Sequence, residues 1–540
     1  MCRDVTPQSK QKPKLGGNRA ALFVYATPGL ENMTFIANAL SLVTYFFGYM
    51  NFSLAKSATT LTNFLGTSFM LALFGGLISD TYLSRFRTSI LFGGIEVLGY
   101  TILTAQAHFP ELRPVPCKDM PLTKMNQCEV ASSGQVVLLF AGLYLVALGT
   151  SGEAPSLSSF FNWLLFSITI GAIFGVTFLV WISTNQGWDW SFGVCTVAVL
   201  VGFLFLAMGK SIYRNKKPKG SPMVRILQVL VAAIRNRNLP VPEMAEELHE
   251  LREKEGGIGS EILHRTNQFR FLDRAAIVRS TGEASTFTVT QVEETKIILR
   301  MLPIILSTIL MSTCLAQLQT FTIQQSTTMD RSLLGFQVPG PSVPVIPLLF
   351  MFILLPIYDR IFVPVARKIT GIPTGITHLQ RIGVGLVLSI ISMAVAGVVE
   401  TLRKNVATKH ICVFWLGVQY SIFGIADMFT LVGLLEFFYA ESSSRMKSLS
   451  TGISWCSMAF GYYTSSVTVE VVNRVSGGWL ASNNLIRDKL NYFYWLLAVL
   501  STVNFGVYLV CASWYKYKKV EMGDVEGKGD CQGNIETGRV

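Results

Sequence analysis

The stretch Lys210-Ser-Ile-Tyr-Arg-Asn-Lys-Lys-Pro-Lys219 opens the longest polar run of the chain, which extends to Lys296. Six apolar runs precede it and six follow, each of about the 20 residues that a helix needs to cross a bilayer. Ionised side chains are costly at the centre of a bilayer, so the polar run cannot lie in lipid. It therefore predicts an aqueous loop that divides an all-α membrane protein into two halves of six transmembrane helices.

The composition agrees with this class. Half of the 540 residues are hydrophobic and 14% are charged, whereas about a quarter of a soluble chain is charged. The net charge of +12 arises from cations at the ends of apolar runs, as the positive-inside rule predicts, and does not indicate nucleic-acid binding. The nine cysteines show no metal-binding spacing. No span carries a nucleophile or metal motif, so we expect no enzyme activity and no cofactor.

The apolar runs give explicit boundaries. The predicted spans are 20–48, 61–84, 88–107, 134–152, 159–183, 190–209, 298–324, 343–364, 380–399, 411–439, 449–472 and 491–514. By parity most flanking lysines and arginines fall on one face, which we take as cytosolic. The predicted parts are a cytosolic tail (1–19), a first bundle (20–209), a cytosolic central loop (210–297), a second bundle (298–514) and a cytosolic tail (515–540). A helix over 243–255 is expected in the central loop.

Similar residues recur at the inner ends of the second and eighth spans. They are Gly75, Gly76, Asp80 and Arg85 in the first half and Asp359 and Arg360 in the second. Two halves with matching inner-face motifs favour alternating access, with these residues in a gate where small glycines let helices approach closely. The alternative is ordinary charge that sets the topology.

These residues resemble the inner-loop motif of the major facilitator superfamily. Five further stretches together resemble the plant nitrate/peptide transporter family, a branch of the proton-coupled oligopeptide transporters: Phe160–Trp163, Gln291–Glu294, Tyr358–Pro364, Arg367–Gly371 and Glu436–Tyr439. The local sequence is most similar to the subfamily that includes abscisic acid, gibberellin and nitrate carriers. The resemblance implies the major facilitator fold and secondary transport of a small organic anion. Coupling to protons is one alternative for the driving force, and nitrate is the second candidate substrate.

The resemblance also implies substrate-binding residues. Glu436 is similar to the family's cavity-facing acid on the tenth span. In the seventh span, Gln317, Thr320 and Gln324 share one helical face and could hydrogen-bond an anion or neighbouring helices. An apolar pocket could be completed by Asn38, Phe321, Tyr420 and Trp455, although aromatic residues in spans more often pack or face lipid.

Proton coupling is expected at Glu31 and Glu436. An acid within an apolar helix faces a cavity or a partner by default, although Glu31 could instead be solvated at the inner interface. The family pattern Glu-x-x-Glu-Arg has lost one acid and its arginine here, since the chain reads Pro28-Gly-Leu-Glu31-Asn32. Leu315 stands where nitrate-carrying relatives have histidine, which disfavours nitrate as the sole substrate.

One segment departs from the family. Gly149–Phe160 lacks the longer Gly-Ile-Lys and Gly-Ala-Asp-Gln-Phe-Asp segment of relatives, which leaves the fourth span short. The chain would then be a transport-impaired splice form or a membrane sensor.

Cys117 and Cys128 share a predicted outer loop and could form a disulfide or remain free thiols. We expect a monomer, with both termini cytosolic, in the plasma membrane or alternatively the vacuolar membrane.

Overall fold

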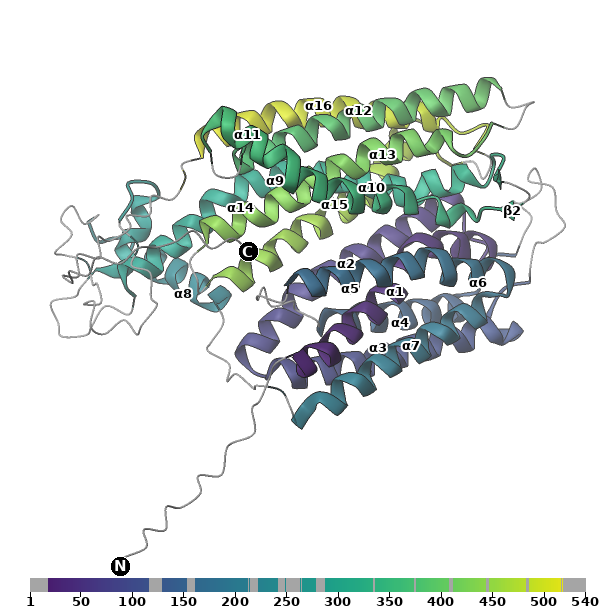
Figure 1. The fold of residues 1–540 in the computed structure, drawn as a ribbon, viewed down its shortest axis with the longest axis horizontal. Helices are drawn as coiled ribbons and strands as arrows, with labels where there is room; N and C mark the ends of the chain where they lie inside the picture. Colours follow the sequence, from purple (N-terminus) through teal and green to yellow (C-terminus); the bar gives the residue numbers. More distant parts are fainter. Residues whose placement is uncertain are drawn as a thin grey trace, which may run out of the picture.

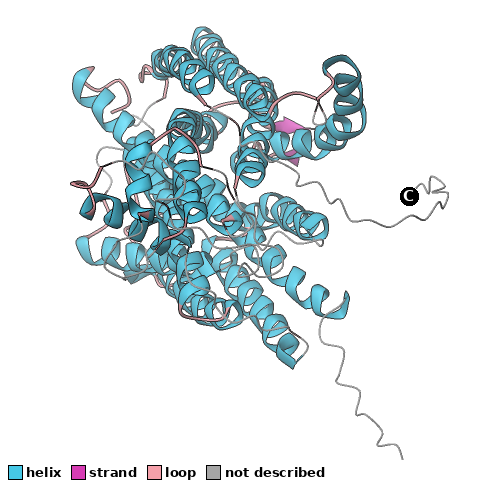
Figure 2. Ribbon diagram, turned by 90° about the vertical axis from the view of Figure 1, so that its left-hand side faces the viewer, coloured by secondary structure: helices cyan, strands magenta, loops and turns pink. Residues whose placement is uncertain are grey.

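The computed structural model describes most of the two bundles. The described residues are 18–115, 129–152, 161–211, 213, 222–240, 248, 263, 265–277, 287–333, 336–372, 375–406, 411–442, 446–481, 485–515 and 517. They form an almost entirely helical protein (Figure 2). Its described strands are the two-residue pair β1 (Ser332–Leu333) and β2 (Phe336–Gln337), which are antiparallel.

The first half consists of six long helical spans, which lie together in the lower part of Figure 1. They are α1 (Asn18–Gly48), α2 (Leu54–Thr81), α3 (Arg85–His108), α4 (Ser133–Gly149) with the short turn η3 (Thr150–Gly152), α5 (Phe161–Phe174) joined to α6 (Val180–Asn185) through the π-helical turn η4 (Gly175–Leu179), and α7 (Trp188–Met208). Short 3₁₀ turns η1 (Pro110–Leu112) and η5 (Gly209–Ser211) follow α3 and α7.

The second half repeats this plan in the upper part of Figure 1. Its spans are α9 (Val289–Ser326), α10 (Val345–Ile357) joined to α11 (Val363–Thr370) through the π-helical turn η9 (Tyr358–Phe362), α12 (His378–Asn405), α13 (Trp415–Asp427) joined to α14 (Gly433–Glu441) through the π-helical turn η10 (Met428–Val432), α15 (Lys447–Val475) and α16 (Leu490–Trp514). The prediction of an all-α protein with two six-helix bundles is confirmed.

Local sequence signals set the starts of two long helices. Thr377 and Gln380 form a reciprocal capping box at the start of α12, which satisfies backbone N–H groups that lack helical partners. Thr288 and Gln291 do the same for α9. For this reason α9 begins at Val289, earlier than the predicted span at 298, and its first turns extend beyond the predicted membrane segment.

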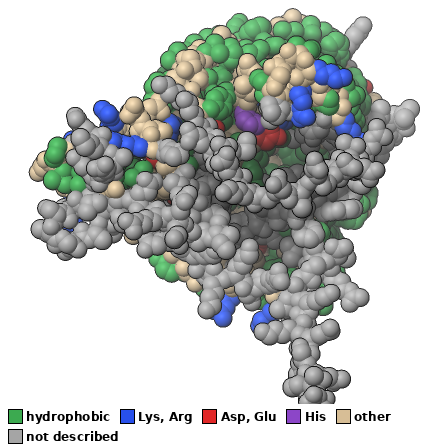
Figure 3. Space-filling model, turned by 60° about the vertical axis from the view of Figure 1, so that its left-hand side comes forward, with side chains coloured by type: hydrophobic (Ala, Val, Ile, Leu, Met, Phe, Trp, Pro, Cys, Tyr) green, Lys and Arg blue, Asp and Glu red, His purple; other side chains and the backbone are tan. Residues whose placement is uncertain are grey.

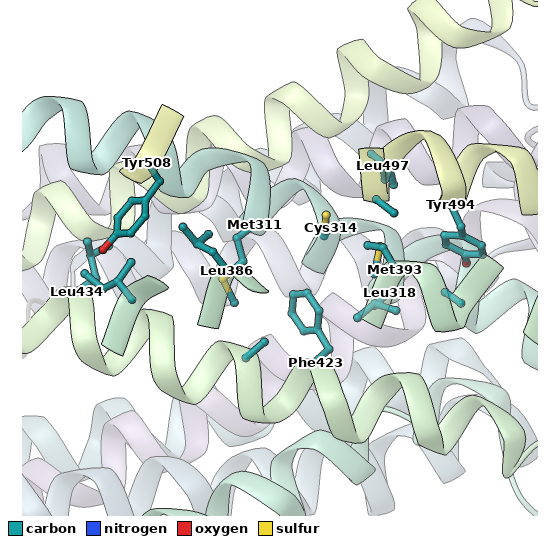
Figure 4. Close-up of a cluster of buried hydrophobic side chains, with 14 of the residues drawn as sticks. Met311, Cys314, Leu318, Leu386, Met393, Phe423, Leu434, Tyr494, Leu497 and Tyr508 are labelled. Carbon is teal, nitrogen blue, oxygen red and sulfur yellow. The ribbon is translucent and has the colours of Figure 1, made fainter. Parts of the chain in front are cut away.

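Each bundle has its own apolar core. In the second half, Met311 of α9, Leu386 of α12 and Phe423 of α13 meet beneath α16 (Figure 4). The halves contact each other along α2 and α15, where the Thr67 and Tyr463 hydroxyls lie 2.8 Å apart. A few residues of α2, α9 and α15 pack in the core of the opposite half, so the two cores meet at the contact between the bundles.

The outer surfaces of the bundles are apolar. Eight described helical segments are long and apolar enough to cross a membrane. On α16, Val503, Val507 and Val510 are each more than half exposed. Hydrophobic side chains also cover much of the described surface in Figure 3. Such a surface is stable in lipid and would be a liability in water.

The described part of the central loop packs against the extended start of α9. It includes the amphipathic helix α8 (Pro222–Arg235) and the 3₁₀ turn η7 (Arg270–Ala276). Val229, Leu272 and Val292 contribute one buried side chain each from α8, η7 and α9. The expected helix over 243–255 lies outside the described residues except for Leu248, so α8 is the surface helix that the structure shows.

Candidate transport site

A small cavity, with an enclosed volume of about 20 Å³, lies in the second half between α9, α15 and the α13–η10–α14 span. Asp427 supplies its acid and precedes the π-helical turn η10. Its other lining residues are hydroxyl-bearing or aliphatic: Thr308, Met311, Ser312, Leu315, Thr430, Leu431, Leu434, Ser454, Ser457 and Met458. One acid among hydroxyls and apolar walls is suited to an amphipathic ligand.

The local backbone shapes this cavity. A π-helical turn inserts an extra residue into an α-helix and is frequent at functional sites. Gly385 of α12 allows the close approach to η10, because a Cβ there would lie 2.0 Å from the Thr430 hydroxyl. On the other wall, the Thr308 and Ser457 hydroxyls are 2.9 Å apart and link α9 to α15. The three spans are therefore packed tightly around the cavity.

Glu436 lies elsewhere on the same span. Its carboxylate accepts a hydrogen bond of 2.8 Å from Arg381 of α12 and lies 3.7 Å from Nδ1 of His378. The Arg381 side chain is only 5% exposed, and its guanidinium stacks 4.4 Å from the ring of Tyr358. Neither of the two cavities described here includes Glu436. The structure thus couples Glu436 to α12 and η9 and places Asp427 in the cavity.

The amides expected in the seventh span are all buried. Gln317 donates to the Ser465 hydroxyl at 2.7 Å, and the Thr320 hydroxyl donates to the Ala316 carbonyl of its own helix. Gln324 is 3% exposed, and neither polar atom of its side chain has a hydrogen-bond partner among the described residues. Gln324 is therefore the residue of this group whose amide can still accept and donate.

The aromatic candidates divide into two groups. Trp455 of α15 stacks on Phe69 of α2 with ring centroids 5.4 Å apart, and Phe69 also stacks on Tyr462. These rings line the contact between the halves. Phe321 instead packs on Phe493 within the second core.

Two further candidates make hydrogen bonds within a bundle. The Tyr420 hydroxyl donates to the Leu318 carbonyl at 2.7 Å. Asn38 donates to the Tyr100 hydroxyl at 3.1 Å and so links α1 to α3. Trp455 is thus the aromatic candidate that the structure places between the bundles.

Glu31 lines a second small cavity, with an enclosed volume of about 10 Å³, inside the first bundle. Glu96 of α3 lines the same cavity and is 2% exposed, although no role could be assigned to it from the sequence. Thr27 and Ser89 add hydroxyl groups. The cavity reading of Glu31 therefore has geometric support, with Glu96 as a second acid that only the fold brings near.

The predicted gate residues have different surroundings. A Cβ at Gly75 would lie 1.9 Å from the Ser151 carbonyl oxygen, so the end of the shortened fourth span packs directly on α2. A Cβ at Gly76 would meet no described atom within 4 Å, so close approach is seen at Gly75 and stays a prediction for Gly76. The backbone places three further gate residues as expected, near the ends of α2, α3 and η9: Asp80, Arg85 and Asp359. Their side chains lie outside the described set. Arg360 of η9 is exposed. The predicted pair Cys117 and Cys128 lies outside the described residues.

We expect Gly75→Ala to destabilise the protein by roughly 1–3 kcal/mol, because the added methyl group must displace the backbone of η3. Gly76→Ala is the matched control, with the same change in composition and helix propensity at the adjacent position. Thermal unfolding of the two purified variants in detergent measures the difference. Equal transition temperatures would contradict the close α2–η3 contact.

Comparison with known proteins shows which family the chain belongs to. The model of the POT family (PTR2) matches residues 86–485. The chain is 43% identical to Protein NRT1/PTR FAMILY 4.6 of Arabidopsis thaliana, with 94% of this chain and 95% of that protein covered. It is 44% identical to Protein NRT1/PTR FAMILY 4.5 of the same plant, with 93% and 94% covered.

Solved structures share the fold. An auto-inhibited POT family peptide transporter superposes with a TM-score of 0.66 at 15% identity, over 95% of this chain and 99% of that chain. A POT family transporter in complex with 5-aminolevulinic acid superposes with a TM-score of 0.62 at 10% identity, over 93% and 98%. The chain therefore belongs to the POT family, whose plant NRT1/PTR branch it resembles, and it is a multi-pass membrane transporter and not an enzyme.

Proposed function

We propose that this protein is a secondary active transporter of a small organic-acid anion, with a plant hormone such as abscisic acid or gibberellin as the first candidate substrate. The observation that supports this most is the cavity with one acid, Asp427, among hydroxyl-bearing and aliphatic side chains. Such walls favour an amphipathic molecule over a small inorganic ion. Leu315, where the resemblance suggests a histidine in nitrate carriers, lines this cavity. Nitrate is therefore the second candidate.

Transport would proceed by alternating access around this site. The halves meet along α2–α15, where Phe69 stacks on Trp455. Near η8 (Gly340–Ser342), the Ser342 hydroxyl also donates to the Val176 carbonyl across the halves at 2.9 Å. Rocking of one bundle against the other would break contacts of this kind at one end and form others at the opposite end.

The roles of the acids follow from their positions. Asp427 would bind substrate or proton in the cavity, whereas Glu436 would act through its ion pair with Arg381. Glu31 remains the proton-coupling candidate of the first half, now with Glu96 in the same cavity. The remaining candidates are Gln317, Thr320, Gln324, Phe321, Tyr420, Asn38 and Trp455. Gln324 has a side-chain amide without a hydrogen-bond partner among the described residues, and Trp455 lies at the contact between the halves.

The topology and membrane belong to the same proposal. The central loop and both termini would be cytosolic, and the first and second bundles would span 20–209 and 298–514. The plasma membrane is favoured over the vacuolar membrane. We propose a monomer, because the two halves complete their apolar cores together within one chain.

The test is uptake into proteoliposomes with an imposed inward proton gradient. We expect saturable accumulation of abscisic acid or gibberellic acid, and less of nitrate, with loss of accumulation when the gradient is collapsed. The same substrates are also tested on a chain in which the missing fourth-span segment is restored, which distinguishes a transport-impaired form from a sensor. Uptake only by the restored chain would identify the present form as transport-impaired, and saturable binding without uptake by either would favour a sensor.

A further inference from the structure

Helix α8 presents an exposed apolar face. Val224, Leu227, Val231 and Ile234 are 39%, 54%, 63% and 64% exposed, and their spacing places them along one side of the helix. The opposite side is buried, with Val229 and Ala233 at 0% and 3% exposure. That buried side packs on η7 and the start of α9. The exposed side is therefore not needed to hold α8 in place.

The sequence that contains and flanks α8 has charge of a single sign, although Arg225 of α8 lies 3.8 Å from Glu294 of α9. Between Asp189 and Glu243 the sequence contains no acid, whereas it contains the cations Lys210, Arg214, Lys216, Lys217, Lys219, Arg225, Arg235 and Arg237. Arg235 and Arg237 are exposed beside the apolar face. Basic residues beside a membrane are attracted to anionic lipid headgroups by about 1 kcal/mol each. This charge is complementary to an anionic lipid surface.

The position of α8 agrees with that partner. Phe269, which precedes η7, packs edge-on against Trp514 at the end of α16, with ring centroids 6.1 Å apart. Tryptophan is enriched where spans leave the bilayer. The Asn236 amide just after α8 donates to the Arg274 carbonyl of η7 at 2.8 Å. Figure 1 places α8 at the end of the molecule opposite α6 and β2, and Figure 3 turns that end forward, with basic side chains among hydrophobic ones.

We infer that α8 lies on the inner surface of the membrane, with its apolar face inserted among anionic lipids. Its buried face joins η7 and α9, so the helix ties the central loop and the second bundle to one leaflet. A helix with an apolar face and a basic border is the physical form of an interfacial anchor. The site goes beyond transport itself, and its test needs no transported substrate.

The full-length protein is reconstituted in nanodiscs of phosphatidylcholine alone or with 30% phosphatidylserine. An environment-sensitive fluorophore is attached at Leu227→Cys, with Asn238→Cys in the exposed turn after α8 as the matched control, and signal from native cysteines is subtracted with the parent chain. We expect brominated lipid chains to quench the Leu227→Cys probe at least twofold more than the control. Phosphatidylserine should increase that quenching.

A second variant tests the charge. The double variant Arg235→Glu, Arg237→Glu should remove the phosphatidylserine dependence of quenching at Leu227→Cys. A cysteine on the buried face, Val229→Cys, should not react with the fluorophore in the folded protein. Equal quenching at Leu227→Cys and Asn238→Cys would overturn the inference. A probe that is shielded from water but unaffected by brominated lipid would also overturn it, because it would indicate a protein partner.

Discussion

Asp427→Asn should lower the initial rate of proton-driven uptake at least about tenfold, which corresponds to ~1.4 kcal/mol in the transport barrier. Asn keeps the size of the side chain and its ability to hydrogen-bond, but it cannot exchange a proton. An acid within an apolar span is costly, so its presence in a cavity favours a functional role. The measurement is uptake of the best substrate of the panel under an imposed pH gradient, beside uptake without a gradient.

The matched comparison is Glu436→Gln, the same loss of charge on the same span. This change leaves Arg381, which is 5% exposed, without its carboxylate partner, although Glu436 itself is 46% exposed. We therefore expect a modestly lower unfolding temperature for Glu436→Gln, because the buried guanidinium loses the charge that compensates it. Asp427→Asn should unfold like the parent chain.

The two variants also decide between the acids. If Asp427→Asn transports normally and Glu436→Gln is inactive yet folded, the cavity around Asp427 is not the coupling site. Glu436 would then hold the role that the sequence predicted for it. Unchanged flux in Glu436→Gln would remove Glu436 from the mechanism.

The choice between these two acids shows what the sequence could not provide. Span length and flanking charge are local quantities, so the twelve spans and their division could be predicted. Which side of a span faces a cavity depends on how the helix is rotated. Asp427 and Glu436 are separated by nine positions, which is about two and a half turns at 3.6 residues per turn and would place them on opposite sides of a regular α-helix. The π-helical turn η10 between them shifts the rotation further.

Contacts between segments that are distant in the sequence could not be predicted either. The pairing of Glu436 with Arg381 joins two spans, and the shared cavity of Glu31 and Glu96 joins α1 to α3. No spacing within one helix signals such neighbours. Helix α8 is a different case, since its apolar periodicity was present in the sequence but lay within a run whose charge suggested only an aqueous loop.

Lys296→Met should release the described part of the central loop from α9. Lys296 is fully buried and lies 2.6 Å from Asp273 of η7 and 2.7 Å from Glu293 of α9. Methionine keeps the length of the side chain but leaves two buried carboxylates with less compensating charge. Breaking a buried ion pair costs about 3–5 kcal/mol. At about 1.4 kcal/mol per factor of ten, local opening of the loop should increase on the order of 100-fold.

Limited trypsin digestion of the reconstituted protein measures this opening, since Arg270 and Arg274 lie in η7. Arg474→Met is the control, because the Arg474–Glu470 pair is exposed and such pairs contribute little. Cleavage near η7 should accelerate in Lys296→Met alone. The same cleavage rate in both variants would contradict the proposal that the Lys296 ion pairs hold the central loop against α9.

The position of this network explains why its loss should stay local. Glu293 also accepts hydrogen bonds from the backbone and hydroxyl of Thr266, at 2.9 and 2.7 Å, so the start of α9 is bonded directly to the loop. The core around Met311 and Phe423 lies further along the spans and shares none of these charges. Lys296→Met should therefore expose the loop while the main unfolding transition of the second bundle changes less. Since α8 packs on η7, the same variant should also weaken lipid quenching at Leu227→Cys, which links the buried charge cluster to the membrane contact of α8.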